Sequence, residues 1–168
     1  RSLSDEQIVS HAIHVFGMSE SAMDQIFRDE MNAMTNPTMA PYAKEGDCLL
    51  QVTAKAESVE KAEEMMKPVI EHVKDVLGDI IFGIDIDTVE ESVMQLLKKK
   101  GMTFTAAESC TGGELAKRFT DIPGASEFFL GGVTTYTNEA KAKLLGIDPA
   151  LIKEKTAVSY EVAKEMAE

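Results

Sequence analysis

The sequence predicts two domains of different class. Residues 1–84 are expected to form a small α+β domain, and residues 85–168 a three-layer α/β/α domain with a mainly parallel sheet that is incomplete at its C-terminus. All three histidines and seven of the ten methionines precede residue 85, whereas seven of the eleven glycines follow it. In the second domain, short strand-like runs alternate with helix-like stripes, an order typical of a parallel sheet covered by helices.

The first domain is expected to begin with two helices. A capping-box pattern at Ser4 and Gln7 precedes apolar residues at helical spacing, which predicts a helix over residues 4–16. A second helix should begin near Ser19 and direct four apolar side chains inward: Ile26, Phe27, Met31 and Met34. Methionines at this spacing are more typical of a core than of a binding groove.

The rest of the first domain should be a loop, a strand, a helix and a short strand. Pro37 and Pro41 predict an extended loop, because each restricts the residue before it. Strict alternation of apolar and polar residues over 48–56 predicts a half-buried strand. A helical stripe follows over 59–77, and its internal proline should kink or divide the helix. The apolar run 80–82 should complete the domain as a strand.

The second domain is expected to alternate helices and strands. In chain order, the expected elements are a helix over 88–100 with Val89, Val93, Leu96 and Leu97 as its core face, a strand over 102–107, a helix after Gly113 with Leu115, Ala116 and Phe119 inward, a strand over 128–136, a helix from Thr137 or Asn138 to Gly146, and a helix capped by Ser159. This order predicts that functional side chains gather at the carboxyl ends of the two strands.

Charge and composition exclude several classes of protein. The net charge of −12 argues against direct nucleic-acid binding, because neutralising phosphates requires a basic face. The apolar runs are too short to span a bilayer, so no membrane partner is expected. Cys48 and Cys110 provide no disulfide framework and indicate reduced thiols in a cytoplasmic protein. His11 and His14, three apart on an expected helix, lack a third ligand, so we predict no metal.

Ser109 is the candidate nucleophile. It follows the strand expected over 102–107 and precedes the start of the next helix, where an α/β sheet normally carries its site. Gly112 and Gly113 would let the backbone approach a substrate closely, and free N–H groups there could hold an oxyanion. An ordinary helix start after a strand would show the same residues, so the motif alone leaves both interpretations open.

A serine nucleophile needs a base, and every histidine lies in the other domain. A lysine can take this role where burial and a helix N-terminus favour the neutral amine over the ammonium. Lys141 lies at the start of an expected helix, just after the strand that contains Gly131 and Gly132. Tyr136, five residues earlier, offers a hydroxyl that could relay a proton or orient the serine.

Five motifs follow one another at the spacing of one known family. They are Ala107-Glu108-Ser109-Cys110-Thr111-Gly112-Gly113, Pro123-Gly124-Ala125-Ser126, Gly131-Gly132-Val133-Thr134-Thr135-Tyr136-Thr137-Asn138-Glu139-Ala140-Lys141, Leu144-Leu145-Gly146 and Ala157-Val158-Ser159. Together they resemble the C-terminal domain of the competence/damage-inducible protein A (CinA) family. The first domain resembles the segment that precedes it in full-length members, so the resemblance covers essentially the whole chain.

The resemblance implies an amide hydrolase that deamidates nicotinamide mononucleotide to nicotinic acid mononucleotide and ammonia, a step of pyridine nucleotide salvage. Carried over by motif, Ser109 would be the nucleophile, Lys141 the general base and then acid, and Tyr136 the orienting hydroxyl. The implied substrate contacts come from the glycine turns and the following helix: Thr111, Gly112, Gly113, Gly131, Gly132 and Asn138. The scheme requires no metal and no cofactor.

Two parts of the family pattern have no counterpart in these residues. One is the N-terminal nucleotide-pyrophosphatase domain, and the other is a glycine loop of the Thr-Gly-Ile-Ala-Gly-Pro type beside the active site. We therefore expect a fragment of a longer enzyme with impaired activity. The alternatives are a non-catalytic competence- or damage-associated binding module and a phosphate-binding domain of other chemistry. An unpaired sheet edge would also favour a homo-oligomer.

Overall fold

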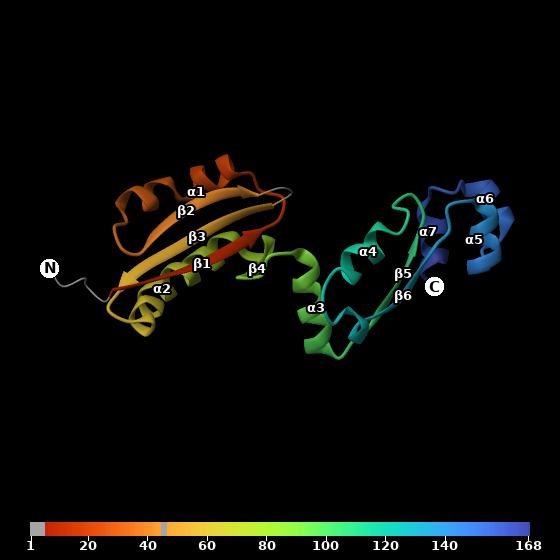
Figure 1. Cartoon of the computed structure of the whole chain (residues 1–168). Coiled ribbons are helices and arrows are strands. Elements are labelled where there is room, and N and C mark those ends of the chain that lie inside the picture. The colour runs from red at the N-terminus through yellow and green to blue at the C-terminus, as the bar shows by residue number, and fades with distance from the viewer. Residues whose placement is uncertain (1–5, 45–46) are drawn as a thin grey trace. The chain divides into compact units, whose positions relative to one another are not determined.

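The computed structural model describes residues 6–44 and 47–168 of the chain. They form two compact units, unit 1 ending at Ser92 and unit 2 running from Val93 to Glu168 (Figure 1). The sequence places the domain boundary at 84/85, whereas the compact units divide eight residues later, inside the helix α3 (Val89–Lys100). None of the described helices is long and apolar enough to cross a membrane.

Unit 1 contains a four-stranded antiparallel sheet in the order β2-β3-β1-β4. The strands are β1 (Gln7–Val15), β2 (Thr38–Lys44), β3 (Asp47–Ala56) and β4 (Ile81–Ile84). Strand β3 shows the expected alternation, because Cys48, Leu50, Val52 and Ala54 are buried on one face. That face carries the core of the unit.

Two helices cover the apolar face of this sheet (Figure 1). They are α1 (Glu20–Ala33), capped by Ser19, and α2 (Val59–Leu77), capped by Ser58 and followed by the short 3-10 helix η1 (Gly78–Ile80). Fully buried side chains from α1 and α2 complete the core: Met23, Phe27, Ala62, Met66 and Val73. Of the four side chains expected to point inward from this helix and its end, Phe27 is buried but Ile26 is about half exposed.

The helix expected over residues 4–16 is wrong, since Gln7–Val15 forms strand β1; Ser4 lies outside the described residues. Apolar residues in this stretch satisfy both periods, because Val9, Ile13 and Val15 also share one face of a strand. β-Branched residues favour a pleated surface. The decisive interaction is long-range: β1 pairs along its whole length with β3 and on its other side with β4.

Two further expectations about prolines in unit 1 need correction. Pro41 does not lie in a loop but within β2, paired opposite Leu50. This strand is at the edge of the sheet, the position where a residue without an N–H is tolerated. Pro68 does not divide α2, which continues as one helix from Val59 to Leu77. Pro68 and Glu64 are both exposed, so the carbonyl that loses its N–H partner can bond to solvent.

Unit 2 contains two parallel strands, β5 (Phe104–Glu108) and β6 (Phe129–Thr134). Their connection is α4 (Glu114–Thr120) and the short 3-10 helix η2 (Ala125–Glu127), and β6 is followed by α5 (Asn138–Leu145), α6 (Pro149–Lys155) and α7 (Tyr160–Ala167). The rings of Phe104, Phe119 and Phe129 pack where α4 covers the sheet. A parallel sheet after an antiparallel α+β unit confirms the predicted fold class.

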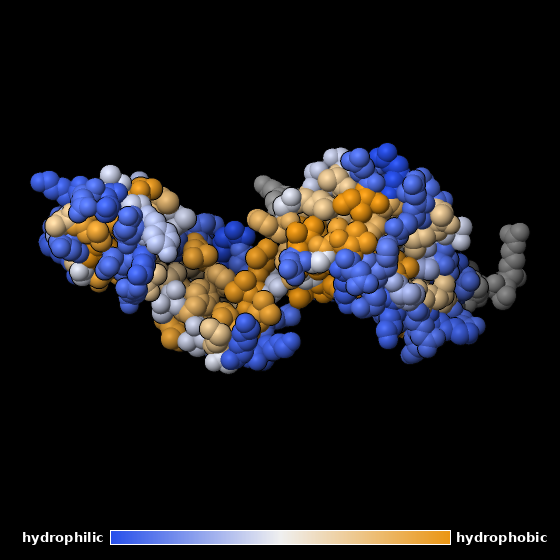
Figure 2. All heavy atoms as spheres, turned by 180° about the vertical axis from the view of Figure 1, so that it is seen from behind, coloured by the Kyte–Doolittle hydropathy of each residue, from blue (hydrophilic) through white to orange (hydrophobic). Residues whose placement is uncertain are grey.

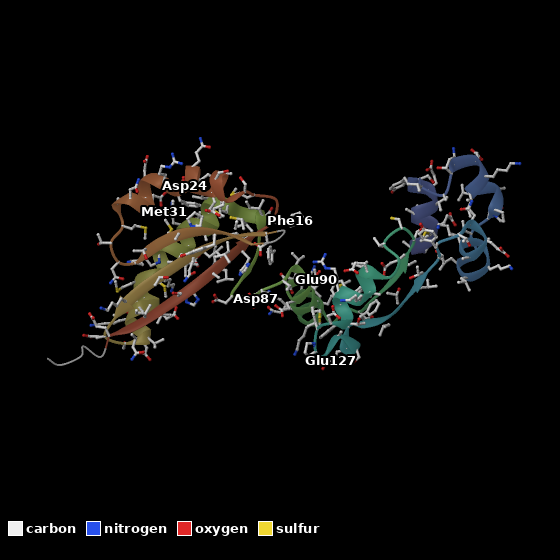
Figure 3. All side chains as sticks on the ribbon, turned by 45° about the horizontal axis from the view of Figure 1, so that its top comes forward. Phe16, Asp24, Met31, Asp87, Glu90 and Glu127 are labelled. Atoms are coloured by element: carbon white, nitrogen blue, oxygen red, sulfur yellow. The ribbon has the colours of Figure 1, made fainter. Side chains whose placement is uncertain are left out.

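Helix α3 begins where predicted, but its buried face differs. Thr88 caps it by accepting the N–H of Glu91, and Asp87 and Glu90 flank its start (Figure 3). Met94 is the buried apolar residue of this helix, whereas Leu96 of the predicted core face is about half exposed. Elsewhere the surface of both units mixes charged residues with exposed apolar ones (Figure 2).

Candidate active site

Ser109 lies in the turn that joins the end of β5 to α4. The end of β5 is held in place by the residue that follows β6, because the N–H of Thr135 donates to the carbonyl of Glu108 over 2.8 Å. The Thr135 hydroxyl donates to the same carbonyl over 3.4 Å. The backbone immediately before Ser109 is therefore fixed by the neighbouring strand, as expected for the carboxyl end of a parallel sheet.

Lys141 lies in the first turn of α5, which Thr137 caps by accepting the N–H of Ala140. Its side chain is 1 % exposed. The Nζ atom is 2.8 Å from Ser109 Oγ and donates to the carbonyl of Thr135 over 2.6 Å. The structure thus brings together two of the three predicted catalytic residues, although they are 32 positions apart in the sequence.

Lys141 forms no salt bridge within the described part of the chain. Its two contacts are a hydroxyl and a carbonyl. A neutral amine satisfies both, since it can donate to the Thr135 carbonyl and accept the Ser109 hydroxyl proton. The geometry therefore suits the pairing of a serine nucleophile with a lysine base.

Thr135 and Glu108 are two site residues that we did not predict. Thr135 is fully buried, and its main-chain carbonyl accepts a hydrogen bond from Lys141. Any residue type has such a carbonyl, so the sequence does not indicate this role. Glu108 is 5 % exposed. Its carboxylate accepts the N–H groups of Gly113, Leu115 and Ala116 at 3.2, 3.0 and 2.9 Å. The sequence shows only an acidic residue directly before the candidate nucleophile, and its burial and its bonds to α4 appear first in the structure.

The hydrogen bonds of Glu108 outweigh the effect of its burial. Burial raises the pKa of this carboxyl, but donation from Ala116, Thr111, Leu115 and Gly113 lowers the pKa by more, so the net pKa lies below its ordinary value. The group is therefore ionised at neutral pH.

Two of the four N–H groups in the turn between Ser109 and α4 are already bonded. Gly112 donates to the Ser109 carbonyl over 3.0 Å, and Gly113 donates to Glu108. Both glycines have positive φ, 64° and 100°, which explains why glycine occupies these positions. Within the described chain, no residue accepts a hydrogen bond from the N–H groups of Cys110 and Thr111. The candidate oxyanion donors therefore shift from the expected residues 111–113 to Cys110 and Thr111, whose N–H groups are unbonded among the described residues.

The structure does not place Tyr136 against the Ser–Lys pair. Its side chain is 74 % exposed, and no hydrogen bond joins it to another described residue. Asn138, the first residue of α5, is also exposed and lines a separate hollow of about 390 Å³ between α5 and α6. The roles implied for both residues stay predictions.

Gly131 and Gly132 line an open cleft of about 500 Å³ over the face of the β5–β6 sheet beside α7. Neither Ser109 nor Lys141 lines this cleft. Gly132 has a packing reason to be glycine, because a Cβ there would lie 3.1 Å from the carbonyl oxygen of Ala106. The two glycines therefore line a cleft that includes neither Ser109 nor Lys141, and their substrate contacts stay predictions.

The two histidines weighed as metal ligands point to opposite faces of β1, since residues three apart in a strand alternate. His11 lies between Asp85 and Glu63, and His14 Nδ1 is 2.9 Å from Asp47. Among the described residues, no three His, Cys, Asp or Glu side chains lie in an arrangement that could hold a metal ion.

The arrangement defines an α/β protein with a half-buried serine paired to a buried lysine at the carboxyl end of a parallel strand. Comparison with family models assigns both parts of the chain. Residues 86–168 match the CinA C-terminal domain, and residues 10–83 match the damage-inducible protein CinA KH domain. The chain belongs to the CinA family.

Curated relatives agree with this assignment along nearly the whole chain. A CinA-like protein of Dictyoglomus turgidum is 44 % identical over 161 residues, which are 96 % of this chain and 39 % of the relative. A putative competence-damage inducible protein of Clostridium beijerinckii is 43 % identical over 98 % of this chain and 40 % of the relative. The chain therefore spans about two fifths of the length of these relatives.

Solved structures of the same superfamily match about half of the chain. The CinA superfamily protein of Escherichia coli is 36 % identical, with a TM-score of 0.45 over 49 % of each chain. A competence/damage-inducible protein of Agrobacterium tumefaciens is also 36 % identical, with a TM-score of 0.45 over 46 % of this chain and 47 % of that one.

Proposed function

We propose that unit 2 carries the active site of an amide hydrolase that deamidates nicotinamide mononucleotide. The observation that carries the proposal is the 2.8 Å contact between Ser109 Oγ and the buried Lys141 Nζ. The family resemblance of the motifs around both residues supports the choice of substrate.

In the proposed first half-reaction, neutral Lys141 takes the hydroxyl proton of Ser109 while Oγ attacks the carboxamide carbon. The carbon–nitrogen bond then breaks, and Lys141 returns the proton to the leaving nitrogen, which departs as ammonia. In the second half-reaction, Lys141 takes a proton from water as the hydroxide attacks the acyl-serine. The ester bond breaks, Lys141 returns the proton to Ser109, and the pyridine carboxylic acid leaves and loses its own proton to solvent as the carboxylate.

The surroundings supply the two other requirements of this chemistry. The Thr135 carbonyl accepts one hydrogen bond from Lys141 Nζ and so holds the amine in place. In the proposed neutral form, the lone pair of Nζ is then free to face Ser109 Oγ. The free N–H groups of Cys110 and Thr111 flank the nucleophile and serve as the proposed donors to the developing oxyanion, a contribution of about 10²–10³ in rate per donor.

Ammonia release from nicotinamide mononucleotide tests the proposal. We would measure it for this chain and for a longer family protein that contains it, each with and without Ser109→Ala. The hydrolase is supported if Ser109→Ala abolishes ammonia release and Ser126→Ala leaves it unchanged. Ser126 is an exposed serine of the same unit and serves as the matched control. Folded proteins that release no ammonia would overturn it.

The same variants separate the competing hypotheses. A non-catalytic binding module, which the names of the relatives suggest, predicts that Ser109→Ala leaves partner binding intact and that no ammonia forms. A phosphate-binding domain of other chemistry predicts that Lys141→Ala weakens nucleotide binding without any catalytic step to lose.

A further inference from the structure

The Ser–Lys chemistry leaves one buried ionised group of the site without a role. Glu108 directly precedes the nucleophile, is 5 % exposed and carries a carboxylate whose pKa is lowered by its hydrogen bonds. Burial of a charge is costly unless it is well bonded. Its place in the site therefore calls for an explanation that begins from its contacts.

Glu108 caps α4 in a way that differs from the other helices. α1, α2, α5, α6 and α7 are each capped by a side chain at the residue just before the helix: Ser19, Ser58, Thr137, Asp148 and Ser159. α4 has Gly113 at that position and no side-chain cap there. Its N–H groups are instead satisfied by Glu108, so the capping bonds reach across the turn that contains Ser109.

The same residue connects the nucleophile to the base. The Glu108 carbonyl accepts from the Thr135 N–H, and the Thr135 carbonyl accepts from Lys141 Nζ, which contacts Ser109 Oγ. The main-chain carbonyl of Glu108 therefore closes a ring of hydrogen bonds through Thr135, Lys141 and Ser109, while its carboxylate ties the turn that contains Ser109 to α4. A change in how Glu108 is held would move Ser109 relative to Lys141.

We propose that Glu108 is a positioning residue that fixes the separation of Ser109 and Lys141 by tying the nucleophile turn to α4 on one side and to Thr135 on the other. Its carboxylate also occupies the N–H groups at the start of α4, which leaves those of Cys110 and Thr111 as the donors for substrate. This inference rests on the proposed Ser–Lys chemistry.

Glu108→Gln is the sharpest variant, because it keeps the size of the side chain and removes one acceptor oxygen. Both carboxylate oxygens accept N–H groups, Oε1 from Ala116 and Oε2 from Gly113 and Leu115, so an amide NH₂ must face a donor. We expect kcat for deamidation to fall about 100-fold, the cost of misplacing a reacting group by about 1 Å. KM should change less than about threefold, and the shape of the pH–rate profile should be unchanged.

A second readout does not depend on nicotinamide mononucleotide. A small fluorophosphonate labels an activated serine, and we would follow its rate of reaction with Ser109 in this chain by mass spectrometry. Glu108→Gln should lower this rate by a factor similar to its effect on kcat. A chain that labels at Ser109 but releases no ammonia would overturn the proposed substrate, and the labelling rates would then decide the role of Glu108 alone.

Ser159→Ala is the matched control for a purely structural role. It removes the cap of α7 in the same unit, where Ser159 Oγ accepts the N–H of Val162, and should lower stability without changing the labelling rate. Glu108→Asp, with a shorter carboxylate, should restore part of the rate that Glu108→Gln loses. If Glu108→Gln does not fold, Thr111→Val removes only the hydroxyl that donates to Glu108 and should slow labelling severalfold.

Two outcomes would overturn the inference. One is a Glu108→Gln protein that loses thermal stability as Ser159→Ala does while its labelling rate and kcat stay unchanged. The other is a wild-type chain whose Ser109 does not label at all, since no activated serine would then exist for Glu108 to position.

Discussion

The two units bury different kinds of residue. Unit 1 has one continuous apolar core in which a four-stranded sheet and two helices meet. Among the described residues of unit 2, the buried apolar side chains form two small separate clusters, one around Phe119 and one around Ile152. Between the ends of its two strands unit 2 buries Glu108, Thr135 and Lys141 instead. The unit with the smaller apolar core carries the polar network.

This difference shows where stability and chemistry lie in the chain. Burial of apolar surface contributes about 25 cal/mol per Å² to stability and does not require a bonding partner at a fixed distance and angle. A buried polar network stabilises only when every member is bonded, and it then holds its members in one arrangement. Unit 1 is built for the first effect and the site of unit 2 for the second.

Loss of the base is the largest expected effect. Lys141→Met keeps the apolar stem and removes the amine, so ammonia release should fall about 1,000-fold, within the range that positioned proton transfer contributes. Lys143→Met, at an exposed position on the same helix, should keep the wild-type rate. Equal rates for the two variants would show that Lys141 is not the base.

Removal of one aromatic ring from each core should show that the two units unfold independently. Phe27→Ala in unit 1 and Phe119→Ala in unit 2 should each lower the free energy of unfolding of its own unit by about 3–5 kcal/mol. Hydrogen exchange followed by mass spectrometry would report protection of peptides from each unit. We expect Phe119→Ala to abolish protection of β5 and β6 and to leave β1 and β3 protected. Joint loss in both variants would contradict independent cores.

The smallest expected effect is a pH dependence confined to unit 1. Hydrogen bonds to Asp85 and then Glu63 raise the pKa of His11 above its unfolded value of about 6.5. The stabilisation is therefore fully present below that unfolded value and is lost as the pH rises through the folded pKa. Both carboxylates are about half exposed, so the effect should stay below about 1 kcal/mol.

Urea unfolding of wild type and His11→Gln between pH 5.5 and 8.5 would measure this effect, with unit 1 and unit 2 followed separately by hydrogen exchange. The difference between the two proteins should shrink as the pH rises. Unit 2 contains no histidine and should show no such change. A difference that grows with pH would contradict the assigned sign.

Where local pattern and long-range packing agree, the sequence was sufficient to predict the structure. The alternation in β3 and the serine and threonine caps of α1, α3, α5 and α7 are examples, because each depends on residues a few positions apart. Strand β1 was mistaken for a helix because its apolar residues fit both periods, and only pairing with residues 48–56 and 81–84 decides between them.

The candidate site divides in the same way. Ser109 and Lys141 could be predicted from the chemistry of their side chains at the ends of expected elements, together with the family resemblance. Thr135 and Glu108 could not, since their contributions depend on which carbonyl or N–H group lies opposite them. Tyr136 was predicted from its closeness to Lys141 in the sequence and from the family resemblance; its exposed side chain makes no hydrogen bond to another described residue, so its role stays a prediction.

The adjacent Gly131 and Gly132 have unlike consequences for how the chain tolerates mutation. Gly131 has φ of 140° and open space around it, so any L-residue there meets backbone strain that no neighbouring substitution can relieve. Gly132 lacks positive φ but is crowded by the Ala106 carbonyl and the ring of Phe129, at 3.1 and 3.3 Å from an added Cβ. A saturation library should therefore find both positions intolerant. Only at Gly132 could a second substitution help, because a smaller residue at 129 would remove the contact with the ring, although the contact with the Ala106 carbonyl would remain.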